Sequence, residues 1–102
     1  GVAVAASDAE RSILAIASLI AADRRRLLET PKATSASYRL FELLPMMPRF
    51  TIEKVRQRLE TSFPTATAAV KILEGLGIVT ERTGQKTHRN YAYAAYIDLL
   101  AD

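Results

Sequence analysis

The chain has 102 residues, of which 49% are hydrophobic and 25% are charged, and its net charge is +3. These totals are typical of one globular domain with a modest core and argue against intrinsic disorder. The absence of cysteine excludes disulfides, thiolate nucleophiles and cysteine-based zinc sites. The apolar stretches are too short to span a bilayer, so we expect no membrane partner. Because the chain begins at Gly1 and not at Met, we expect a piece of a longer protein.

A long helix is predicted from Ser7 to Glu29, where helix-forming residues dominate and neither Pro nor Gly interrupts the sequence. Four apolar side chains recur along it at helical spacing: Ile13, Ile16, Ile20 and Leu27. This apolar stripe has two explanations, which are packing against the residues that follow and formation of a homodimer through the N-terminal helix. The run Asp23–Arg26 also has two explanations. Its arginines contact phosphates, or they belong to a solvated helix end where cations lie near the negative pole of the helix dipole.

Three shorter helices are predicted in the middle of the chain. Thr51 caps one of them, with Phe50 and Val55 placed as the two halves of a hydrophobic staple. Pro64 lies in the first turn of another, and Gly77, just after that helix, is expected in the left-handed region. The three helices run from Lys32 or Thr34 to Leu44, from Ile52 to about Glu60, and from Ser62 or Phe63 to the residues before Gly77.

After Gly77 the pattern changes from helical spacing to alternation, which predicts a β-hairpin. Tyr91 and Tyr93 alternate with Asn90 and Ala92, so the two tyrosines are expected on one buried face. The predicted segments are a strand over Ile78–Arg82, a turn over residues 83–88, a return strand over Arg89–Tyr93, and a closing helix over Ala94–Leu100.

The order of these elements is that of a winged helix-turn-helix domain. We therefore predict a mainly α fold, a winged helix-turn-helix with a small antiparallel β-hairpin, preceded by a long N-terminal helix. Residues 1–32 form the N-terminal helical segment and residues 33–102 form the winged domain. In DNA-binding members of this class, the second helix of the turn pair enters the major groove, and here that helix begins at Pro64.

Basic charge is concentrated in the winged half, which indicates duplex DNA as a partner more strongly than the net charge does. From Arg49 to Tyr93 there are eight Lys and Arg residues against four acids. The candidate nucleic-acid-binding residues are short hydroxyls near a helix start and the cations of the helix and wing: Ser62, Thr65, Thr67, Lys71, Arg82, Lys86, His88 and Arg89. The alternative is a protein-interaction or regulatory module with a solvated hairpin, because the groove helix carries one cation and no Arg, Asn or Gln for base edges.

The sequence offers no catalytic centre. His88 is the only histidine, and no Ser, Asp or Cys stands near it at a catalytic spacing. The four glycines are scattered and form no phosphate-binding loop. We therefore predict that this chain is not an enzyme and uses no cofactor or metal.

Several short motifs resemble the C-terminal region of Fic (Fic/Doc) family proteins. The family's S-[FY]-P-T-A, L-G-I-[LV] and Y-[LI]-D-[LI]-L patterns correspond to Ser62–Ala66, Leu76–Val79 and Tyr96–Leu100. Further similarity lies at Phe50–Thr51, Thr83–Gly84, Arg89–Tyr91 and the G-V-A stretch Gly1–Ala3, so the resemblance spans nearly the whole chain.

The resemblance implies a regulatory or targeting appendage on a bacterial, cytoplasmic protein adenylyltransferase, which transfers AMP to a protein hydroxyl. The family's catalytic motif, H-P-F-x-x-G-N-G-R, is absent here, because His88 is followed by Arg89 and Asn90. No catalytic residue of the family is therefore carried over. The catalytic Fic core of the longer protein would be the partner of this module.

Overall fold

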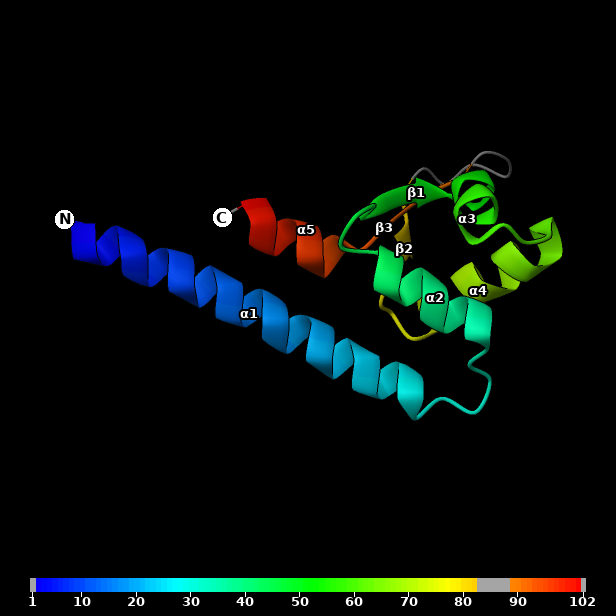
Figure 1. The fold of residues 1–102 in the computed structure, drawn as a ribbon, viewed down its shortest axis with the longest axis horizontal. Coiled ribbons are helices and arrows are strands. Elements are labelled where there is room, and N and C mark those ends of the chain that lie inside the picture. The colour runs from blue at the N-terminus through cyan, green and yellow to red at the C-terminus, as the bar shows by residue number, and fades with distance from the viewer. Residues whose placement is uncertain (1, 83–88, 102) are drawn as a thin grey trace.

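The computed structural model describes residues 2–82 and 89–101, with side chains over residues 13–82 and 89–100. Within these ranges the fold is mainly helical, with a small three-stranded antiparallel sheet (Figure 1). The helices are α1 (Val2–Leu28), α2 (Ser35–Leu43), α3 (Ile52–Leu59), α4 (Phe63–Gly75) and α5 (Ala94–Ala101). The strands are β1 (Arg49–Thr51), β2 (Thr80–Glu81) and β3 (Asn90–Ala92).

Helix α1 confirms the long helix predicted at the N-terminus, and it begins five residues earlier than expected, at Val2 instead of Ser7. The alanines before Ser7 explain the extension, because Ala has the highest helix propensity. The helix runs along one side of the molecule with α5 packed beside it (Figure 1). Near its C-terminal end Leu27 is fully buried in the common core, whereas Ile13 is 67% exposed. The apolar stripe thus packs on the core through Ile20 and Leu27, and its start is exposed.

The shorter helices start where their caps predict. Thr34 and Ser37 form a capping box at α2, in which each side-chain oxygen accepts a hydrogen bond from the other residue's backbone N–H. The Thr51 hydroxyl accepts a 3.2 Å bond from the Lys54 N–H at the start of α3. Ser62 caps α4 in the same way. These local bonds satisfy amide groups that the first helical turn leaves unpaired.

A three-residue turn, residues 60–62, joins α3 to α4, and α4 packs against both α2 and α3. Glu60 begins this turn in the left-handed region, with φ of 52°. Gly77 also has positive φ, at 77°, as its position after α4 predicts. Ala66 and Ala69 are fully buried on α4, and their small side chains allow the close approach of the neighbouring helices.

The sheet has the strand order β1-β3-β2, and both pairs are antiparallel. Phe50 and Glu81 flank Tyr91 in the register, while Arg49 and Thr80 flank Ala92. The two strands predicted after Gly77 are confirmed as the antiparallel pair β2 and β3, and both are shorter than expected. The turn predicted over residues 83–88 lies outside the described residues. Strand β1 was not predicted. Ala92 corrects the expected alternation, because it is 2% exposed and therefore as buried as the two tyrosines.

One apolar core joins the helices to the sheet. The rings of Phe50 and Tyr91 stack with centroids 5.9 Å apart, and Phe41 meets Tyr93 at 6.4 Å. The large side chains that are fully or almost fully buried in this core are Leu27, Leu40, Leu44, Val55, Leu59, Val70, Leu73, Val79, Tyr91 and Tyr93. The core thus fixes β1, β3 and the start of α3 relative to one another.

Candidate nucleic-acid interface

The hydroxyls predicted at the start of α4 are exposed and hydrogen-bonded to each other. Ser62 Oγ accepts a bond from the Thr65 N–H at 3.3 Å and donates to Thr65 Oγ1 at 2.9 Å. Both residues therefore lie at the surface, as expected, but their polar atoms already serve as a helix cap. A ligand would share these hydroxyls with the cap instead of meeting free groups.

Thr67 corrects the expectation that its side chain points outward. Its hydroxyl oxygen is buried and has no hydrogen-bond partner among the described residues. The reason is helical geometry: Thr67 lies three positions before the fully buried Val70, at the edge of the face that α4 buries. Thr67 is not available to read a base edge.

The predicted cations do not form one cluster. Lys71 is exposed, but its ammonium pairs with Glu74 at 3.2 Å, and it borders a separate hollow beside Thr30 and Lys32. Arg89 Nε lies 3.7 Å from Glu81 Oε1. Arg82 is exposed and forms no ion pair with any residue that the structure describes. Lys86 and His88 lie outside the described residues.

A different set of cations gathers around a hollow of about 550 Å³ over β1, β3 and the start of α3. Arg49 from β1, Lys54 from the start of α3, and Arg82 just after β2 line it, and we call it the basic hollow. The other lining residues are Phe50, Thr51, Asn90, Tyr91 and Ala92. No acidic side chain is among these described lining residues. Arg49 and Lys54 were not among the sequence-predicted site residues.

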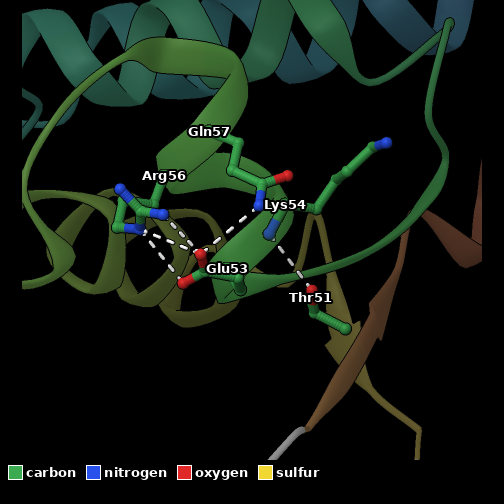
Figure 2. Close-up of polar contacts among 5 residues, drawn as sticks. All are labelled: Thr51, Glu53, Lys54, Arg56 and Gln57. Carbon is green, nitrogen blue, oxygen red and sulfur yellow. Dashed lines mark hydrogen bonds and ion pairs between the residues drawn. The ribbon is translucent and has the colours of Figure 1, made fainter.

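On α3, Lys54 keeps its charge uncompensated while its neighbour Arg56 does not. Arg56 Nε donates to Glu53 Oε2 at 3.0 Å, and Gln57 adds a weaker bond to the same carboxylate (Figure 2). The hydrogen bond from Arg56 lowers the pKa of Glu53 below its usual value, and the same bond raises the pKa of Arg56. The Lys54 side chain extends away from this cluster (Figure 2).

The arginines of the run Asp23–Arg26 that form contacts have a structural role. Arg24 forms two 3.1 Å hydrogen bonds to the Glu42 carboxylate and lies over the Phe41 ring. Arg26 pairs with Asp23 at 3.2 Å and also donates to the carbonyl of Leu76. These contacts tie α1 to α2 and to the end of α4. The run does lie at the exposed C-terminal end of α1, with Arg25 and Arg26 in its last turn, and Arg24 and Arg26 add contacts that the sequence did not predict.

The described residues contain no cluster of His, Cys, Asp and Glu side chains that could hold a metal ion. No described helix is long and apolar enough to cross a bilayer. No known family model and no curated protein matches the chain.

Proposed function

We propose that residues 33–102 form a winged helix-turn-helix module that binds duplex DNA. The observation that carries the proposal is the order α2, β1, α3, α4, β2, β3 combined with the strand order β1-β3-β2. A helix pair joined by a three-residue turn, followed by an antiparallel hairpin, is the arrangement that DNA-binding members of this class use. In this arrangement α4 is the helix that enters the major groove, and its N-terminal residues Ser62 and Thr65 are exposed.

The charge distribution supports a polyanion as the partner. The eight cations between Arg49 and Tyr93 outnumber the acids two to one. Arg49, Lys54 and Arg82 are exposed, and none of them forms an ion pair with a described residue. The acids of this half that do form ion pairs, among the described side chains, pair with Arg56, Lys71 and Arg89. Uncompensated cations on one side of a domain raise the local concentration of polyanions and bind phosphates.

Helix α4 favours binding with little sequence preference. Lys71 is its one cation, and it already pairs with Glu74. The helix has no Arg, Asn or Gln, which are the side chains that form bidentate contacts with guanine and adenine. We therefore propose that contacts with phosphates provide most of the affinity, and that different duplexes bind with similar strength.

The test is a titration of fluorescently labelled duplexes of several sequences with the whole chain at low salt. The proposal expects saturable binding to each duplex, with affinities that agree to within about tenfold. A single-stranded oligonucleotide of the same length is the control for duplex preference. The absence of binding to any duplex would reject the proposal and favour a protein-interaction module.

The resemblance to Fic proteins extends the proposal to the longer protein. The motifs at Ser62–Ala66 and Tyr96–Leu100 support a role as the C-terminal appendage of a protein adenylyltransferase. In that setting the module itself is inert. Incubation of this chain with labelled ATP, Mg²⁺ and candidate protein substrates should give no labelled product, whereas transfer that is lost when His88 is changed would contradict the proposal.

A further inference from the structure

The basic hollow brings together three cations, none of which forms an ion pair with a residue that the structure describes. Five other cations form ion pairs with acidic side chains: Arg24 with Glu42, Arg26 with Asp23, Arg56 with Glu53, Lys71 with Glu74, and Arg89 with Glu81. Around the hollow, Arg49, Lys54 and Arg82 are exposed and form no ion pair with a described residue. Sequence separation does not explain this grouping, because up to 33 positions separate these cations. The fold itself brings them together.

The backbone holds the three cations in fixed places. Arg49 lies on β1 opposite Ala92 of β3. Lys54 lies in the first turn of α3, where its N–H is bonded to the Thr51 cap. The backbone N–H of Arg82 donates a 2.7 Å hydrogen bond to the carbonyl of Asn90. Each cation thus extends from a hydrogen-bonded position, so little main-chain ordering is needed when an anion binds.

Three like charges around one hollow repel one another, and the attraction of an anion bound between them offsets that repulsion. The stacked rings of Phe50 and Tyr91 lie under the hollow and are 4% and 0% exposed. A low-polarity floor strengthens the attraction between the cations and an anion relative to the same charges in water. The hollow is therefore built to bind negative charge.

We infer that the basic hollow is an anchoring site for the sugar–phosphate backbone of duplex DNA, separate from the groove-facing start of α4. The inference rests on the proposed function and adds the residues that supply its affinity. Single-stranded nucleic acid is disfavoured because proteins that bind it offer exposed aromatic faces for base stacking. Here Phe50 and Tyr91 stack on each other and are buried. A backbone with one charge per strand about every 3.4 Å suits several neighbouring cations.

The experiment compares two triple variants that lose the same charge. The first is Arg49→Ala, Lys54→Ala and Arg82→Ala, and the second is the control Arg25→Ala, Lys32→Ala and Arg58→Ala. The control residues are exposed, form no ion pair with any residue that the structure describes, and line no part of the basic hollow. The hollow variant should bind duplex about tenfold or more weakly than wild type, and the control less than about threefold. Circular dichroism establishes that both variants remain folded.

A third variant, Arg49→Lys with Arg82→Lys, keeps the charges and should retain binding within about threefold of wild type, because a lysine also binds phosphate as a point charge. Equal losses in the two alanine variants, with wild type binding duplex, would overturn the anchoring site but leave the proposed function standing. A wild-type chain that binds no duplex would reject the proposed function itself. Two further results would overturn the assignment to duplex DNA. One is that inorganic phosphate displaces labelled duplex as effectively as unlabelled duplex does at the same phosphate concentration. The other is that anionic phospholipid vesicles bind the chain as tightly as duplex does.

Discussion

The hydroxyl of Tyr93 donates a 2.6 Å hydrogen bond to Asp23 Oδ2, joining the residue after β3 to the C-terminal part of α1 across 70 positions. Both residues are buried, at 1% and 6% exposure. Arg26 binds the other carboxylate oxygen of Asp23, and the Tyr93 N–H donates to the carbonyl of Pro48. Tyr93 thus connects α1 to the sheet that carries the basic hollow.

The change Tyr93→Phe should lower the free energy of unfolding by about 1 to 3 kcal/mol, because it leaves a buried carboxylate oxygen without its donor. Urea denaturation measures the change. Tyr96→Phe is the matched control, since the Tyr96 hydroxyl makes only a 3.4 Å exposed contact with the Pro45 carbonyl. A loss no greater in Tyr93→Phe than in Tyr96→Phe would show that the buried bond adds no stability.

Stability should also fall at alkaline pH because of Tyr93. Burial, and then the hydrogen bond to the negative Asp23, raise the pKa of Tyr93 far above its usual value of 10.0. Below pH 10 both the folded and the unfolded chain keep the phenol proton, so this stabilising effect is complete. Above pH 10 the unfolded chain releases the proton and the folded chain does not, so the unfolding free energy decreases. Urea titrations between pH 8 and 11 should show a steeper decrease in wild type than in Tyr93→Phe, and parallel curves would refute this.

Tyr91→Phe should have the opposite effect on stability to Tyr93→Phe. The Tyr91 side chain is fully buried, and its hydroxyl has no hydrogen-bond partner among the described residues. Removing an unpaired buried hydroxyl while keeping the ring should raise the unfolding free energy by about 1 kcal/mol. The same urea assay measures it, and a decrease in stability would show that the hydroxyl has a partner that matters.

The local signals in the sequence were sufficient to predict the helices. Thr51, Ser62 and Gly77 act within one helical turn of their own positions, and each start or stop that they predicted is confirmed. Thr67 was placed wrongly because the edge of a buried helix face depends on which neighbour packs there.

Strand β1 and the basic hollow depend on contacts that the sequence does not encode locally. Phe50 was interpreted only as part of a hydrophobic staple, and its three-residue strand is too short to give a pattern of alternation. The pairing of Phe50 with Tyr91 links positions 41 residues apart. Without that pairing, nothing in the sequence brings Arg49 and Lys54 beside Arg82, although the excess of basic charge in this half was visible.

The exposed start of the apolar stripe on α1 carries the prediction of a homodimer. Ile13 and its neighbour Leu14 are 67% and 66% exposed, whereas Leu27, near the other end of α1, is fully buried in the core. We expect self-association that increases with concentration and that Ile13→Lys with Leu14→Lys abolishes, since charge opposes burial of this patch. Sedimentation velocity at several concentrations measures it. A single monomeric species at high micromolar concentration would exclude the dimer.

The salt dependence of duplex binding tests the central proposal most directly, because it counts the phosphates that the protein neutralises. Each neutralised phosphate contributes about −0.9 to the slope of log affinity against log salt, so Arg49, Lys54 and Arg82 should give wild type a slope of about −3. The Arg49→Ala, Lys54→Ala, Arg82→Ala variant should bring the slope to within about 1 of zero, while the Arg25→Ala, Lys32→Ala, Arg58→Ala control should keep it. A wild-type slope near zero, or a steep slope that survives in the hollow variant, would contradict the account.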